Sequence, residues 1–147
     1  MTRAPRWLKP VNKIYMVLLR RGMSFGAEQP VVLTVQGRRS GRPRSTPITP
    51  MVVDGRRYAV AVFPDADWVA NVRAAEEVTL ADGRNTERVR LVELPPQEAR
   101  AVLRSFPAQV PAGVGFLKHS GLITEGTPDE LEALAGRLPA FRIDSFT

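Results

Sequence analysis

Four arginines lie within eight consecutive residues in the first third of the chain, between two apolar runs that are typical of β-strands. The segment reads Gly37-Arg38-Arg39-Ser40-Gly41-Arg42-Pro43-Arg44. A guanidinium group presents a planar fork of donors that matches a phosphate or a carboxylate, and a serine hydroxyl adds a further hydrogen bond. The glycines allow a tight turn. The segment therefore predicts an anion-binding loop at a hairpin tip, with a basic surface tip that binds no ligand as the alternative.

Composition narrows the chemistry that this loop could serve. The chain has 147 residues, no cysteine and a single histidine, His119. This excludes disulfides, thiol nucleophiles and thiolate metal sites, and it argues against a zinc or iron centre, so we expect no metal. The formal net charge of +6 favours anionic partners. No apolar run approaches the roughly 20 residues of a membrane span, so we expect a cytoplasmic protein.

Alternating apolar residues and turn signals predict a mainly β chain with peripheral helices. The expected strands cover residues 31–36, 45–53, 57–63, 77–81, 86–94 and 141–143. Helices are expected over 68–75 and 95–106 and again after Thr127, with a flexible Gly- and Pro-rich stretch over 107–126. Five or six short antiparallel strands with helices at their ends favour a small barrel, formed as one domain of residues 1–147.

Three of these helices carry specific end or face signals. Asp65 and Asp67 are expected to cap the helix over 68–75. The helix over 95–106 should turn one apolar face inward, made of Ala99, Val102, Leu103 and Phe106. The sequence Thr127-Pro128-Asp129-Glu130 is a capping box with proline at the first helical position, and it predicts a helix that buries Leu131, Leu134 and Leu138.

The N-terminal 22 residues predict an amphipathic helix with a basic face. Its apolar positions recur at steps of three and four from Trp7 to Leu19, and Gly22 ends it. We expect this helix to pack on or near the barrel. The alternative is peripheral attachment to an anionic membrane surface, which would place the protein at the inner face of the membrane.

The motifs together resemble a known family. The block 37–47, the Asp54-Gly55 turn with Tyr58 in the following strand, and Trp68-Val69-Ala70-Asn71 are similar to the deazaflavin (F420)-dependent nitroreductases, also known as the F420H2-dependent quinone reductase family. The resemblance implies a six-stranded antiparallel split β-barrel of the FMN-binding split-barrel type, with coenzyme F420 as the cofactor. It implies hydride transfer from the reduced deazaflavin to an electron-poor small molecule, such as a quinone, an enone or a nitro compound.

The resemblance also implies roles for particular residues. Those expected to contact the phosphate and acidic tail of the cofactor are Arg38, Arg39 and Arg44, assisted by Ser40. Those expected around the deazaflavin ring are Pro47 and Thr49 beneath it, Val62 and Phe63 beside it, and Trp68, which closes the pocket. Asn71 is expected to fix the helix that carries Trp68 rather than to touch the ligand.

The chain departs from the family pattern on the substrate side. The segment between Phe63 and Trp68 is short, and Val69 stands where relatives have a tyrosine. The tyrosines of this chain are Tyr15 and Tyr58, so the C-terminal tyrosines that serve substrate in some relatives are absent. The catalytic residues are therefore unknown, and we expect that no tyrosine of the chain is needed as a proton donor.

Other functions stay open at this point. An FMN-binding split-barrel reductase would need a phosphate site of the same kind, although the extra arginines favour the longer acidic tail of F420. A non-catalytic deazaflavin-binding or membrane-surface protein is a second alternative. Nucleic acid is not an expected partner, because the few aromatic residues are not interleaved with basic ones. The protein is expected to be a monomer or a homodimer that acts on a small-molecule substrate.

Overall fold

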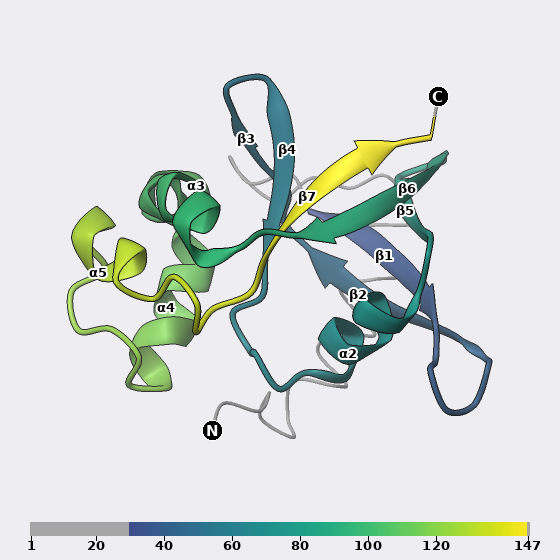
Figure 1. Cartoon of the computed structure of the whole chain (residues 1–147), viewed down its shortest axis with the longest axis horizontal. Helices are drawn as coiled ribbons and strands as arrows, with labels where there is room; N and C mark the ends of the chain where they lie inside the picture. Colours follow the sequence, from purple (N-terminus) through teal and green to yellow (C-terminus); the bar gives the residue numbers. More distant parts are fainter. Residues whose placement is uncertain (1–29, 147) are drawn as a thin grey trace.

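The computed structural model describes residues 30–146, in which seven strands form one antiparallel sheet (Figure 1). The strands are β1 (Val31–Gln36), β2 (Pro43–Ile48), β3 (Met51–Val53), β4 (Arg56–Val60), β5 (Val78–Asp82), β6 (Asn85–Glu93) and β7 (Ala140–Ser145). Their order across the sheet is β2-β1-β5-β6-β7-β4-β3. The last strand of the chain, β7, thus lies inside the sheet, where it pairs with β6 and β4.

The two edge strands of this sheet are neighbours in the chain. β2 ends at Ile48 and β3 begins at Met51, so Thr49 and Pro50 alone connect the two edges. Because each residue spans at most about 3.6 Å, the edges must approach one another at this connection. The sheet therefore curls into a half-barrel rather than lying flat, as Figure 1 shows.

Seven strands replace the six that the sequence predicts. The run over 45–53 is not one strand, because the chain bends at Thr49 and Pro50 and continues as β3. The proline has no N–H to offer to a sheet ladder, so pairing stops there. The strand expected over 57–63 also ends early, at Val60. The Asp54-Gly55 turn forms as predicted, with positive φ at both residues.

The two prolines of β2 occupy positions whose backbone nitrogens point away from β1. Gly37 donates its N–H to Arg42 O at 2.8 Å, so the next β1–β2 pair, Gln36 with Pro43, is a non-hydrogen-bonded pair. By the same alternation Pro47, opposite Val32, turns its nitrogen outward. Two of the outward positions of β2 therefore carry no N–H donor, which blunts this edge.

Four helices are described, and three of them gather on one side of the sheet (Figure 1). They are α2 (Asp67–Ala74), α3 (Pro96–Gln109), α4 (Pro111–His119) and α5 (Pro128–Glu132), of which α3, α4 and α5 form the group. The expectation of a flexible stretch over 107–126 is wrong. α3 continues through Pro107, and α4 packs so closely on it that a Cβ on Gly113 would lie within 2.4 Å of the Phe106 ring.

Two hydrophobic clusters stabilise the described residues. The first fills the curl of the sheet and includes Leu33, Leu80, Val89 and Phe141, with Val69 and Val72 contributed by α2. The second lies under α3, α4 and α5. It contains all four residues of the predicted inward face of α3 and all three leucines predicted beyond Thr127. These burial predictions are confirmed, but α5 ends at Glu132, so Leu134 and Leu138 follow the helix rather than lie in it.

Two other expectations about the helices have different outcomes. The N-cap of α2 is Ala66, which has no side-chain cap, so the prediction that Asp65 or Asp67 caps it is wrong; Asp67 is instead in the first helical turn. The amphipathic helix expected within residues 1–22 lies outside the described residues. None of the helices between residues 30 and 146 is long and apolar enough to cross a membrane.

Glu130 of α5 holds the loop that precedes it. The capping box with Thr127 is present, and Glu130 also accepts backbone N–H groups of Thr124 at 2.8 Å, Glu125 at 2.9 Å and Gly126 at 2.7 Å. These donors lower the pKa of the Glu130 carboxyl from 4.5 to about 2, because they stabilise its charged form.

Glu130→Gln is expected to destabilise the fold at pH 7. A carboxyl with a lowered folded-state pKa stabilises the protein above pH 4.5, and this contribution is lost as the pH falls toward about 2. The stability difference between wild type and variant should therefore shrink over that interval, as measured by urea unfolding at pH 7, 5 and 3. Glu125→Gln removes an exposed charge from the same loop and is the control. A difference for Glu130→Gln that does not change with pH would contradict this account.

Candidate functional site

The arginine-rich loop folds as a tight hairpin connection between β1 and β2. Gly41 donates its N–H to Gly37 O at 2.9 Å, and Arg42 N donates to Ser40 Oγ at 3.2 Å. Gly41 has a φ of +72°, which favours glycine. A Cβ on Gly37 would lie 2.9 Å from Ser40 Oγ and 3.3 Å from Arg42 O. The turn thus favours glycine at position 41, a Cβ at position 37 would crowd the Ser40 hydroxyl, and that hydroxyl serves as an acceptor within the loop.

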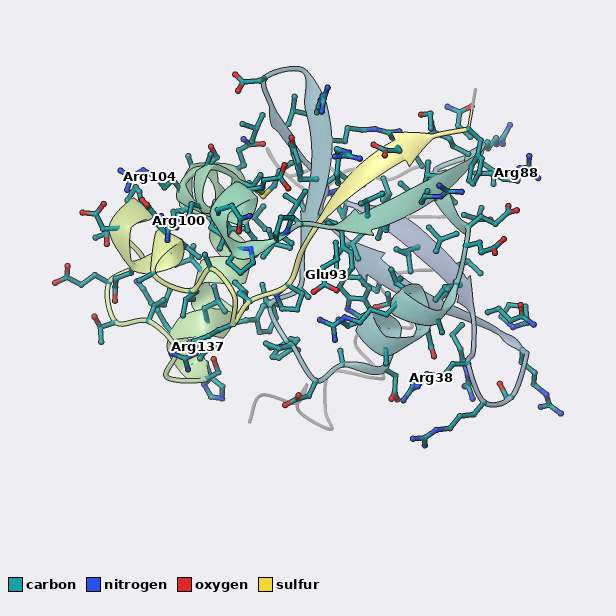
Figure 2. The ribbon with its side chains drawn as sticks, viewed as in Figure 1. Arg38, Arg88, Glu93, Arg100, Arg104 and Arg137 are labelled. Carbon is teal, nitrogen blue, oxygen red and sulfur yellow. The ribbon has the colours of Figure 1, made fainter. Side chains whose placement is uncertain are left out.

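Arg38 is tied to helix α2. Its backbone N–H and its Nη1 both donate to Asn71 Oδ1, at 3.1 and 2.8 Å, and its Nη2 lies 3.5 Å from Asp67 Oδ1. Asn71 is only 4% exposed, and its amide oxygen receives both hydrogen bonds. This geometry agrees with the interpretation that Asn71 holds α2 in place rather than contacting the ligand. Figure 2 shows Arg38 between the loop and α2.

Arg39, Arg42 and Arg44 have no such partners within the described residues. All three side chains are exposed, and none forms an ion pair with a carboxylate among residues 30–146. Elsewhere among residues 30–146 five arginines do form ion pairs: Arg57 with Glu87, Arg73 with Glu93, Arg88 with Glu77, Arg104 with Asp129 and Glu132, and Arg142 with Asp144. Guanidinium groups that share one short loop repel one another, and binding of an anion to the loop would relieve that repulsion.

The residues expected around the deazaflavin ring are half-buried. Trp68 lies in the first turn of α2 and packs on Phe141, with ring centroids 5.9 Å apart. Val62 and Phe63 lie in the link between β4 and α2 rather than in a strand. The rings of Phe63 and of Phe116 in α4 pack edge to face, with their centroids 5.4 Å apart. Pro47 lies in β2, and Thr49 in the bend that follows it.

The structure brings the loop and α2 together directly. Because Arg38 contacts Asp67 and Asn71, the loop lies beside the helical turn that carries Trp68. No hydrogen bond or ring contact among the described residues joins Pro47 or Thr49 to Val62, Phe63 or Trp68. Two residues near the site were not among those predicted: Arg42, which the loop motif contains, and Phe116, which lies in the segment expected to be flexible.

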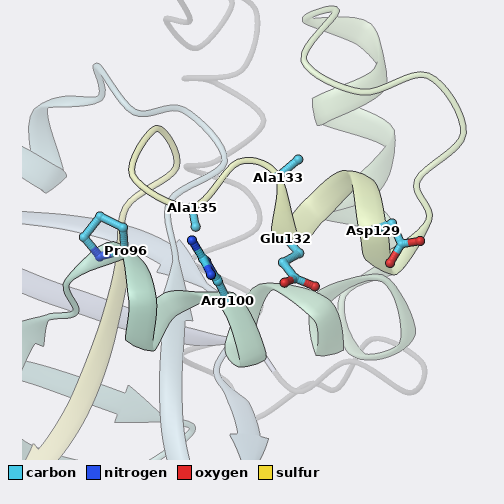
Figure 3. A pocket seen from close by; sticks show the side chains of 6 residues that line it. All are labelled: Pro96, Arg100, Asp129, Glu132, Ala133 and Ala135. Carbon is cyan, nitrogen blue, oxygen red and sulfur yellow. The ribbon is translucent and has the colours of Figure 1, made fainter.

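Two surface depressions are found in the described chain, and the one beside α2 is lined in part by Phe141, on which Trp68 packs. One, of about 610 Å³, runs between α2 and β6 and includes Arg73, Leu91 and Glu93. The other, of about 450 Å³, lies between α3 and α5. Figure 3 shows its lining residues, among them Arg100, Asp129 and Glu132. None of the nine residues predicted to bind the cofactor lines either of these two depressions.

Comparison with solved structures supports the fold. A structure described as a domain-swapped dimer is 20% identical over 94% of this chain and 97% of that chain, with a TM-score of 0.56. An F420-H2 dependent reductase, FDR-A, is 21% identical over 79% of this chain and 94% of its own, with a TM-score of 0.55. A protein of unknown function from Agrobacterium tumefaciens is 13% identical over 99% of this chain and 56% of its own, with a TM-score of 0.56.

Comparison with protein families is more specific. No curated protein matches the chain. The family model described as F420H(2)-dependent quinone reductase matches residues 10–116, which include the arginine-rich loop, the link before α2 and α2 itself. The cofactor of this family is F420, as the motifs led us to expect. The chain therefore belongs to the F420H(2)-dependent quinone reductase family and is an F420H2-dependent oxidoreductase.

Proposed function

We propose that this oxidoreductase binds the anionic part of coenzyme F420 at loop 37–44 and reduces a small electron-poor acceptor of the quinone, enone or nitro class. The observation that carries the proposal is a loop bonded to α2 through Arg38 whose other arginines, Arg39, Arg42 and Arg44, form no ion pair among residues 30–146; Arg38 stays among the residues proposed to contact the cofactor. When bound, the reduced deazaflavin supplies the hydride. The chain's own residues hold the cofactor, orient it and exclude water.

The residues present fit the anionic part of F420. The cofactor carries a phosphate and an acidic tail, and guanidinium groups pair with both phosphate and carboxylate through two parallel hydrogen bonds. The single phosphate of FMN would leave part of this donor set unused, so the several arginines of the loop favour the longer acidic cofactor. Ser40 assists in this proposal by holding the loop, since its hydroxyl accepts the N–H of Arg42 at 3.2 Å.

The ring would then lie against the apolar residues around α2. Trp68, Val62 and Phe63 offer half-buried apolar surface near the base of the loop. Pro47 and Thr49 are proposed to lie beneath the ring. Such a wall positions a planar group by stacking and shape, and it keeps water from the reacting face.

The domain organisation and the oligomeric state are part of the proposal. The described residues form one sheet with two clusters packed on it, which supports a single split-barrel domain over residues 1–147. The domain-swapped dimer among the solved structures supports the homodimer of the two oligomeric states considered. A cytoplasmic location, and membrane contact through residues 1–22, stay predictions.

Arg39→Ala, Arg42→Ala and Arg44→Ala should each weaken F420 binding by about 10- to 100-fold. The reason is that a hydrogen bond to a charged group contributes about 1.5 to 3 kcal/mol. The measurement is a titration of the purified protein with F420 and, in parallel, with FMN, followed by tryptophan fluorescence. Affinity should also fall as salt is added.

Arg84→Ala is the matched control for this experiment. Arg84 is an exposed arginine at the tip of the β5–β6 hairpin, so its removal changes the net charge equally. It should leave the affinity nearly unchanged. Equal losses for Arg84 and the loop arginines would mean that a diffuse positive field attracts the cofactor, and the loop assignment would be wrong. Tighter binding of FMN than of F420 would contradict the choice of cofactor at this loop.

Asn71→Ala should lower the free energy of unfolding of the cofactor-free protein, whereas Arg39→Ala should not. The Asn71 oxygen accepts two hydrogen bonds from Arg38, and losing a buried partner costs about 1 to 3 kcal/mol. Arg39→Ala should change the free energy of unfolding by less than about 0.5 kcal/mol, because its side chain is exposed. Urea unfolding of both variants tests this. An Asn71→Ala variant as stable as wild type would show that the loop does not depend on α2.

Tyr58→Phe should leave hydride transfer nearly unchanged. Tyr58 lies in β4, whereas the proposed ring residues Val62, Phe63 and Trp68 lie in the link that follows β4 and in α2. Single-turnover oxidation of the reduced cofactor measures the effect, with Tyr15→Phe alongside. A hundredfold drop, about 2.7 kcal/mol of transition-state stabilisation, would identify a tyrosine as the proton donor.

A further inference from the structure

The second edge of the sheet, at β3, is closed by a side chain instead of by prolines. β3 has three residues and pairs with β4 around the two-residue Asp54-Gly55 turn, with Val53 opposite Arg56. The residues that flank such a turn form a hydrogen-bonded pair, and pairs alternate along the ladder. Val52, opposite Arg57, is therefore the residue of β3 whose N–H and C=O face away from β4.

Both of these outward groups are bonded to the same side chain. Val52 N donates to Gln109 Oε1 at 2.9 Å, and Gln109 Nε2 donates to Val52 O at 2.8 Å. A carboxamide carries one acceptor and a donor in the same arrangement as a peptide group, so Gln109 occupies the place that a neighbouring strand would take. Gln109 is the last residue of α3, and the helix therefore holds the amide against the edge.

The side chain of Val52 makes this edge different from an ordinary hairpin tip. It is 56% exposed, one of two large hydrophobic residues that are exposed in the described part of the chain. An edge with free backbone groups and an exposed β-branched residue is a template for strand addition. Pro43 and Pro47 blunt the β2 edge by removing donors, whereas the β3 edge contains no proline.

We propose that the carboxamide of Gln109 keeps β3 from pairing with β3 of a second copy of this chain. A second copy fits because an antiparallel pair of β3 strands about a twofold axis is self-complementary. Each Val52 would supply its N–H and C=O to the other, and the two exposed valine side chains would lie close together. This inference does not depend on the cofactor or on the reaction.

The test compares the self-association of Gln109→Ala with that of wild type. Sedimentation velocity over a range of protein concentrations should show that the variant associates beyond the wild-type state, with an association constant at least tenfold larger. Hydrogen exchange at low protein concentration should show that the Val52 amide is protected in wild type and exchanges at least tenfold faster in the variant. Gln97→Ala, an exposed glutamine of the same helix, is the matched control and should behave as wild type.

A double variant identifies the surface involved. Gln109→Ala with Val52→Lys places a charge on the opened edge, which opposes strand pairing, and it should return to the wild-type association state. Unchanged association of Gln109→Ala, or an unchanged exchange rate at Val52, would overturn the proposal. Continued association of the double variant would also overturn it, because the new contact would then lie elsewhere.

Discussion

The two-residue connection between β2 and β3 constrains the whole described sheet. Thr49 and Pro50 join the first and last strands of its order, so the sheet cannot lie flat without breaking the chain. Once it curls, alternate side chains converge on one interior, where Leu33, Val89 and Phe141 are fully buried. α2 contributes Val69 and Val72 to the same interior. The position of α2, and hence of Trp68 and Asn71, follows from this closure.

The arginines of the loop between β1 and β2 differ in their contacts. Arg38 links the loop to α2, since its guanidinium and its backbone N–H both donate to the buried oxygen of Asn71. Arg39, Arg42 and Arg44 carry their charges into solvent on a loop whose conformation is already fixed by Gly37 and Gly41. A site of this kind is preorganised: little order is lost when an anion binds, so more of the interaction contributes to affinity. Repulsion among the three charges destabilises the loop as long as no anion is bound.

The layer of α3, α4 and α5 does more than cover one side of the sheet. It buries the second cluster, in which Met51 of β3 and Ala140 of β7 meet the helices. It also supplies Gln109 to the β3 edge, and Phe116 to the ring of Phe63 beside α2. The same helices that stabilise the fold therefore reach both an exposed sheet edge and the link that leads into the candidate site. Glu130, through its backbone hydrogen bonds, keeps the connection between α4 and α5 in place.

Local patterns in the sequence determined those features that depend on neighbouring residues. The strand over 31–36, the Asp54-Gly55 turn, the inward face of α3, the capping box at Thr127 and the arginine-rich loop each need only a few adjacent residues, and all of them are present. The family motifs in the same segments were also sufficient to predict the family and its cofactor.

Features that join distant residues were decided by the tertiary structure. β7 enters the sheet between β6 and β4, and the helix of α4 persists because Gly113 lets it contact Phe106. Arg38 is separated from Asn71 by 33 residues, and Val52 from Gln109 by 57. A sequence pattern reports propensity and periodicity, but such contacts form only when the curled sheet brings these segments together. For that reason the sequence identified the arginines of the loop, and the fold decided that Arg38 is the one bonded to α2 and that the other three form no ion pair among residues 30–146.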